Sequence, residues 1–349
     1  MSTDDVRRNG NSDEVNLVEL VRQFWKERFL ILAVTLLFLL LAVAYLFIKA
    51  PLYEAKATVR EPSQGDIATL NIGRGEKSGL KLLDVKDVYS VYLRNLQSEA
   101  VRREFFDDVY VPDMRAAGYE VGGDEAYSRF SSGLRIDTSD ANQSARATVA
   151  ILANQPKTAV YWVQLYSNLA ASQATRQLLS DLRSDAKTKA DNLEQQIEID
   201  RESARKQRED KLIQLREALR IARSIGLEKP PFISANLSAE LSSEISGGLT
   251  YMRGSKALEA EIGILEARVS DDPYIQGLRQ KQADVAFYRK LGFDSSGVEV
   301  YQLDGDVMLP DRPTKPRVAL TIVAAGLLGL LIGLVLVAAR NVFRDVRQG

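Results

Sequence analysis

Two long apolar segments lie near opposite ends of the chain and constrain its architecture more than any other feature. The first runs from Phe29 to Ile48 and the second from Val318 to Ala339. Neither contains a charged side chain, and a helix of about 20 such residues crosses a roughly 30 Å hydrocarbon layer while satisfying its own backbone hydrogen bonds. Two spans would place both termini on one side of the membrane and the intervening domain on the other.

The first segment has one alternative reading, a cleaved signal peptide, because Ala42-Val43-Ala44 has the small residues of a cleavage site. The apolar run continues to Ile48 and is longer than a usual signal core, which favours an uncleaved anchor. Positive charges flank the spans slightly more on the tails, which favours cytoplasmic tails. The basic residues concerned are Arg22, Lys26, Arg28, Arg340, Arg344 and Arg347.

The composition excludes several classes of function. The 46 basic and 47 acidic side chains give a net charge of −1, which argues against a nucleic-acid partner. Cysteine and histidine are absent, which excludes disulfides, thiol nucleophiles, a Ser-His-Asp triad and a zinc hydrolase. We therefore expect no enzyme, no cofactor and no metal, with carboxylate-only catalysis as the remaining enzymatic alternative.

The middle of the chain predicts a small α/β base and a long helical hairpin. Lys157 to Ile225 contains no Gly and no Pro, and helix-forming residues fill it. Gly226 and Pro230-Pro231 end this helix, and a second helical pattern returns over Leu258–Leu291. The other expected elements are a strand Tyr53–Arg60, a helix Leu80–Val109, a break Pro112–Gly123, strands Leu134–Ile136 and Ala147–Leu152 around a turn Asp137–Ser144, and a last strand Val298–Val307.

The predicted fold class is an α+β membrane protein in which two transmembrane helices flank a periplasmic domain with a small α/β base and a very long helical hairpin. The expected order is a cytoplasmic tail 1–28, transmembrane helix 29–48, first part of the base 49–156, hairpin 157–291, base strand and Pro-rich segment 292–317, transmembrane helix 318–339 and cytoplasmic tail 340–349.

Small residues form a stripe on the second span. Ala325, Gly329 and Gly333 follow one another at four-residue steps, so they share one helix face. Such a face lets a neighbouring helix approach closely, and the neighbour is either the first span or another membrane protein. The alternative is that glycine is merely tolerated in a membrane helix.

A Pro-rich segment precedes that span. Its prolines recur at every third position, which suits an extended polyproline II strut, and its basic side chains would lie near lipid headgroups. They would pair there with anionic lipid or a pyrophosphate-linked substrate, or serve as plain interface anchors. The residues are Pro310, Pro313 and Pro316 with Arg312, Lys315 and Arg317.

Charged residues dominate the long helix over Glu198–Asp210, which has almost no apolar face. A helix that is polar all round is solvated or packs through polar contacts. Its arginines are either a solvated face or a contact for a neighbouring subunit or a glycan. These arginines are Arg201, Arg205, Arg208, Arg216, Arg220 and Arg223.

Gly73-Arg74-Gly75-Glu76-Lys77-Ser78-Gly79 looks faintly like a phosphate-binding loop. The Walker pattern requires Gly immediately before Lys-Ser, and Glu76 stands there instead. We interpret the segment as a flexible loop.

Several segments in their order resemble the Wzz family of polysaccharide co-polymerases, the O-antigen chain length determinant proteins. The most specific is Tyr251–Ile262, YMRGSKALEAEI, on the returning leg of the hairpin. The others are Tyr53–Ala57 with Pro62, Leu96–Val101 with Phe105-Phe106, Gln155-Pro156 with Ala159, Trp162 and Val163, and the prolines before the second span.

The resemblance implies an inner-membrane protein with both termini cytoplasmic, a periplasmic domain and a bell-shaped homo-oligomeric ring of about eight subunits. It also implies that the protein regulates O-antigen chain length without catalysis, together with the Wzy polymerase, an undecaprenyl-linked glycan and membrane lipid. The short tail after Ala339 disfavours the branch of the family that carries a tyrosine kinase. The alternatives are a membrane-anchored periplasmic adaptor, a polysaccharide export component or a transmembrane receptor.

Overall fold

The structure is a computed structural model that describes residues 25, 27–139, 146–231 and 249–346, with side chains described up to Arg340. The chain divides into two compact units. The first combines Met1–Glu61, Tyr92–Ser172 and Tyr301–Gly349, and the second combines Pro62–Val91 and Gln173–Val300. Two helices, α3 (Val85–Leu96) and α7 (Pro156–Ser224), contribute residues to both units.

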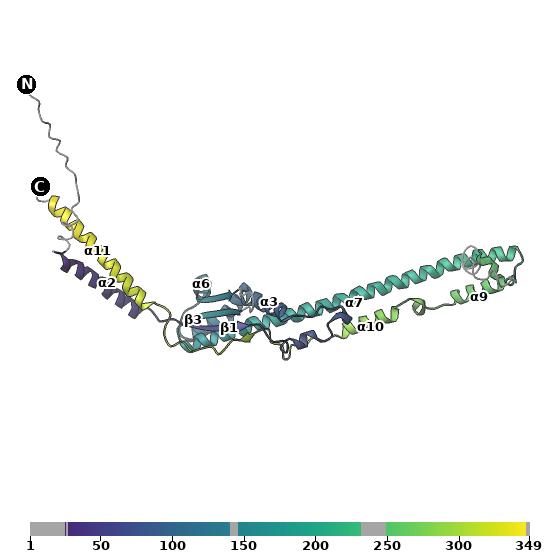
Figure 1. Cartoon of the computed structure of the whole chain (residues 1–349), viewed down its shortest axis with the longest axis horizontal. Coiled ribbons are helices and arrows are strands. Elements are labelled where there is room, and N and C mark those ends of the chain that lie inside the picture. Colours follow the sequence, from purple (N-terminus) through teal and green to yellow (C-terminus); the bar gives the residue numbers. More distant parts are fainter. Residues whose placement is uncertain (1–24, 26, 140–145, 232–248, 347–349) are drawn as a thin grey trace, which may run out of the picture. The chain divides into compact units, whose positions relative to one another are not determined.

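The first unit contains both apolar segments as helices that lie side by side (Figure 1). They are α2 (Arg28–Ile48) and α11 (Val318–Val346). By length and composition, α2 and the Val318–Arg340 part of α11 are apolar enough to cross a membrane. Of the basic tail residues named above, Arg22, Lys26 and Arg347 lie outside the described residues.

The first unit also contains an antiparallel sheet with the strand order β2-β3-β1-β4. The strands are β1 (Tyr53–Arg60), β2 (Leu134–Ser139), β3 (Arg146–Ala153) and β4 (Gln302–Leu303). Val149 of β3 lies opposite both Ala57 of β1 and Ile136 of β2, and it is fully buried. The first three strands confirm the sequence prediction. Residues 140–144 of the expected turn lie outside the described residues, and Asp137–Ser139 belong to β2.

Aromatic side chains form the core between the short helices and the start of α7. The ring centroids of Phe105 and Phe130 are 5.6 Å apart, and those of Tyr110 and Trp162 are 5.1 Å apart. Burial of Tyr166, whose hydroxyl donates to the Leu96 carbonyl, raises the pKa of that hydroxyl to about 12. The short elements are α4 (Glu99–Phe105), the π-helical turn η3 (Phe106–Tyr110), α5 (Val111–Ala116) and α6 (Gly123–Gly133).

Three sequence predictions here differ from the structure in their bounds. The helix expected over Leu80–Val109 begins only at Val85 and is divided at Ser98, whose hydroxyl accepts from Ala100 N and caps a new helix. The break expected over Pro112–Gly123 begins only after Ala116, because Pro112 lies in the first turn of α5, where the missing N–H costs nothing. The last strand is only Gln302–Leu303 and pairs with the end of β1.

The second unit contains a helical hairpin whose outgoing leg is α7. The ion pairs Arg223–Glu259, Arg216–Glu266 and Lys281–Asp200 join the legs in reverse sequence order, as an antiparallel hairpin requires. The returning leg is interrupted by a 3-10 turn at Asp272–Tyr274 and by Gly277, so it is not one continuous helix. Its elements are the 3-10 turn η5 (Thr250–Arg253), α9 (Ser255–Glu266), the 3-10 turn η6 (Asp272–Tyr274) and α10 (Leu278–Lys290).

The segment interpreted above as a flexible loop has a defined position in the second unit. It contains the 3-10 turn η2 (Glu76–Ser78), and the 3-10 turn η1 (Ala68–Asn71) precedes it. The Arg74 guanidinium is almost fully buried and pairs with Asp185 of α7 at 2.9 Å, and the Tyr288 hydroxyl of α10 donates to the Ser78 carbonyl. The segment thus packs against both legs of the hairpin.

Candidate functional site

The contact between α2 and α11 is the closest helix packing at any sequence-predicted site. A Cβ added at Gly329 would lie 2.8 Å from the Thr35 Cα and 3.1 Å from the Phe38 Cβ. A Cβ added at Gly333 would lie 3.1 Å from the Ile31 Cα. All three distances are shorter than an ordinary van der Waals contact, so only a glycine lets the backbones come this close.

The stripe of small residues continues along this seam. Ala325 is half-buried, Gly329 and Gly333 are buried, and Val337, one further four-residue step along, is fully buried. Gly326 lies off the stripe, and a Cβ there would meet only the Leu39 Cδ2, at 3.9 Å. The sequence allowed either the first span or another membrane protein as the neighbour of this face. In the structure the neighbour is the first span, α2.

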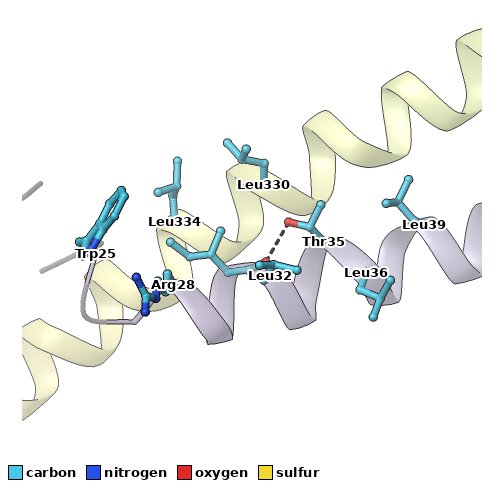
Figure 2. Close-up of a pocket in the computed structure, with 9 residues that line it drawn as sticks. Trp25, Arg28, Leu32, Thr35, Leu36, Leu39, Leu330 and Leu334 are labelled. Atoms are coloured by element: carbon cyan, nitrogen blue, oxygen red, sulfur yellow. Dashed lines mark hydrogen bonds between the residues drawn. The ribbon is translucent and has the colours of Figure 1, made fainter.

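Polar groups at the seam have partners within the pair. The Thr35 hydroxyl, beside Gly329, donates to the Ile31 carbonyl at 2.8 Å (Figure 2). Near one end of the pair, Arg340 of α11 lies 3.5 Å from the Glu27 carboxylate, just before α2. Near the other end, Leu52 N donates to the Lys315 carbonyl at 3.0 Å, and Thr314 N donates back to Leu52 O at 2.8 Å. The two helices are therefore joined at both ends.

The Pro-rich segment lies at the second of these joints. Pro310 and Pro316 are half-buried and Pro313 is exposed, and the segment forms no helix or strand among the described elements. The side chains of Arg312, Lys315 and Arg317 are exposed. They are thus available to an anionic headgroup or glycan, and the strut conformation and these contacts stay predictions.

Five of the six arginines of the α7 row have partners within their own chain. The Arg208 Nε lies 3.1 Å from an Asp271 oxygen, and its Nη1 donates to the Arg268 carbonyl at 3.0 Å. Arg201 donates to both oxygens of Asp272, at 3.0 and 2.9 Å. Arg205 pairs with Glu202 on α7 itself, Arg216 with Glu266 and Arg223 with Glu259. Arg220 is exposed and has no ion pair among the described residues.

These contacts shift the ionisation of the hairpin carboxylates. Hydrogen bonds from Arg201 lower the pKa of Asp272, and the hydrogen bond from Arg205 lowers the pKa of Glu202. Hydrogen bonds to Glu194 and Asp191 raise the pKa of Arg289. The charged row therefore joins the two legs of the hairpin, a role that sequence spacing alone did not reveal. Whether it also contacts a neighbouring subunit or a glycan stays a prediction.

No metal centre is found in the part of the chain that the structure describes. Within residues 25, 27–139, 146–231 and 249–346, no group of three or more Asp or Glu side chains could hold a metal ion. The features that stand out are instead contacts between helices: the seam of α2 with α11 and the ion pairs of the hairpin.

A family profile and curated relatives match this chain under the same description. The Wzz profile, described as chain length determinant protein, matches residues 13–109. A chain length determinant protein of Escherichia coli is 23% identical over 341 residues, which cover 97% of this chain and 96% of that protein.

Solved structures show the same fold. A full-length bacterial polysaccharide co-polymerase, 21% identical, matches with a TM-score of 0.61 and covers 95% of this chain and 99% of its own. The wild-type Shigella flexneri lipopolysaccharide O-antigen chain-length regulator is 19% identical and matches with a TM-score of 0.52. The match covers 74% of this chain and 99% of the regulator's chain. The chain is therefore similar, over nearly its whole length, to the Wzz chain length determinant proteins, the family that its sequence resembles.

Proposed function

We propose that this protein regulates the modal length of lipopolysaccharide O-antigen made by a Wzy-dependent system. The observation that carries this function is the similarity to chain length determinant proteins over nearly the whole chain, spans and hairpin included. The protein acts as an oligomeric periplasmic scaffold without catalysis, and its partners are the Wzy polymerase and the growing undecaprenyl-linked glycan.

Deleting the gene tests this function directly. We expect the lipopolysaccharide ladder on a gel to lose its modal length while polymer is still made, because a regulator sets length and does not form the glycosidic bond. Complete loss of polymer would instead support the export-component alternative, and an unchanged ladder would contradict both. Restoring the gene on a plasmid is the control.

The placement that goes with this function is the inner membrane, with residues from about Lys49 to Arg317 in the periplasm. It rests on the two long apolar helices and on the bias of basic residues toward the tails. Reporter fusions at Ser128 and Gly349 are expected to report opposite sides of the membrane. If both report the same side, one of the two helices does not span.

The scaffold is proposed to be a homo-oligomeric ring, for which the family resemblance implies about eight subunits. Exposed isoleucines on α7 support contacts between copies. At about 100° per residue they fall within about 80° of the helix surface, so they form one apolar stripe, away from the buried core that faces α9. The stripe, with exposed fractions of 47–59%, consists of Ile199, Ile213 and Ile221.

Replacing Ile213 by glutamate is expected to weaken this ring, because it puts a charge into the apolar stripe. The measurement is the mass of the detergent-extracted protein by light scattering, which should fall toward that of a monomer. Ile264→Glu makes the same change at an exposed isoleucine of α9 and is the matched control. A ring of unchanged mass in the Ile213 variant would exclude the stripe as the contact.

A further inference from the structure

An apolar groove of about 550 Å³ runs along the surface of the α2 and α11 pair (Figure 2). Its floor consists of leucines with Ile31 and Thr35, and the Thr35 hydroxyl is already bonded to the Ile31 carbonyl. Polar character is confined to one end, where Trp25 and Arg28 line the groove. The leucines are Leu32, Leu36 and Leu39 of α2 and Leu330 and Leu334 of α11.

The charge at the polar end is not balanced within the described residues. Glu27 already pairs with Arg340, at 3.5 Å. The Arg28 guanidinium has no acidic partner there and instead lies over the rings of Trp25 and Phe29, at 5.8 and 5.4 Å from their centroids. Two guanidinium groups and one carboxylate leave one positive charge, which one phosphodiester would neutralise.

The length of the groove fits one leaflet of a bilayer. From Arg28 to Leu39 the lining residues span 11 positions of α2, about 16 Å at 1.5 Å per residue. Half of the hydrocarbon layer is about 15 Å. A Trp ring and an Arg at the level of the headgroups, with an apolar trough below them, match the arrangement of a lipid in that leaflet.

We propose that this groove binds an anionic glycerophospholipid, whose phosphate is held by Arg28 beside Trp25 and whose acyl chains lie along the leucines. This inference goes beyond chain-length regulation and rests only on the two helices spanning a membrane. The lipid comes from the leaflet on the side of the tails. It would complete a surface that the two helices leave open.

Trp25 provides a local probe for this lipid. The chain has two tryptophans, and Trp162 is 2% exposed in the aromatic core next to the sheet, so lipid quenchers reach Trp25 alone. The full-length protein is reconstituted in phosphatidylcholine nanodiscs containing phosphatidylglycerol, with bromine on the acyl chains of one lipid or the other. We expect brominated phosphatidylglycerol to quench more than brominated phosphatidylcholine at equal mole fraction.

Two variants test the roles of charge and groove. Arg28→Gln should reduce the preference for phosphatidylglycerol about fivefold, the loss of one basic contact at a membrane surface. Arg129→Gln removes an exposed arginine of α6 and should leave the preference unchanged. Leu330→Phe narrows the groove and should reduce quenching by phosphatidylglycerol, whereas Leu331→Phe, on an exposed leucine outside the groove, should not.

Equal quenching by the two lipids in the unchanged protein, or a preference that survives Arg28→Gln, would overturn the proposal. A second copy of the chain is the competing occupant, and the absence of cysteine allows a direct test of it. A Leu36→Cys variant that forms a disulfide between copies in nanodiscs would show a helix in the groove in place of a lipid. Absence of that crosslink together with selective quenching supports the lipid.

Discussion

Replacing Gly329 by leucine is expected to push α11 away from α2 and to shift or broaden the distribution of O-antigen lengths. No space exists for the new side chain, since even a Cβ there would lie 2.8 Å from the Thr35 Cα. That neighbour is backbone and cannot turn aside as the end of a side chain would. One helix must therefore retreat along the seam.

The protein is expected to remain in the membrane at normal abundance. Contacts between membrane helices contribute roughly 1–2 kcal/mol each, which is small compared with the insertion of two long apolar helices. The measurements are the lipopolysaccharide ladder and the amount of protein in membranes by immunoblot. A shifted ladder with normal abundance would tie the seam to the regulation of length.

Gly326→Leu is the matched control. It adds the same side chain to the same helix, where a Cβ meets only the end of the Leu39 side chain at 3.9 Å. Its ladder should differ less from that of the unchanged protein. If Gly326→Leu disrupts the lengths and Gly329→Leu does not, the seam is not the functional face. If neither changes them, the glycines are merely tolerated.

Gly254→Ala is expected to destabilise the distal part of the hairpin by about 1–3 kcal/mol. Gly254 has a φ of 82°, which disfavours any residue with a Cβ. An added Cβ would also lie 2.7 Å from the Glu228 carbonyl oxygen and 2.8 Å from the Lys229 Cα. The chain passes closely here because Ser255 N donates to the Leu227 carbonyl at 2.9 Å.

The effect should be local to the packing of α9 on α7. The small core there would loosen first, and it contains Leu215, Ala218, Ala222, Leu258, Ile262 and Leu265. Hydrogen exchange of amides in α9, compared with amides of β3, measures this opening. Faster exchange confined to α9 is the expected result, and unchanged exchange there would contradict the role given to Gly254.

Gly263→Ala is the control, because it makes the same substitution within α9 itself. An added Cβ there meets nothing within 4 Å. Alanine favours an α-helix over glycine by about 0.5–1 kcal/mol, so this variant should be slightly more stable. Opposite signs at two glycines nine positions apart would separate the effect of the close approach from a general effect of alanine.

Sequence periodicity correctly predicted the helices and strands that local residue preferences alone determine. Pro156–Ser224 is one helix because no Gly or Pro interrupts its helix formers, and β1 follows from alternation over Tyr53–Arg60. The errors lie where a single position is decided by context. Pro112 is compatible with a helix only in its first turn, and the last strand is limited to the two residues that pair with Val59 and Arg60 of β1.

The sequence predicted only the α11 residues of the candidate site, and not the α2 residues that they contact. A four-residue spacing singled out Gly329 and Gly333 on their own helix, but a spacing does not name the partner, and the residues they approach are nearly 300 positions away. Separation along the chain also hid the groove beside Arg28 and the pairing of Arg208 with Asp271. The role of Gly254 depends on Glu228 and was likewise invisible to a local pattern.

The two joints at the ends of the membrane pair have a mechanical consequence. Leu52 bonds to the Pro-rich segment before α11, and β1 begins at the next residue and lies inside the sheet between β3 and β4. Sliding one helix past the other would break those bonds and the Glu27–Arg340 contact together. We therefore expect α2 and α11 to tilt together as one rigid unit. Because α2 leads into β1, such a tilt would twist the sheet at its central strands.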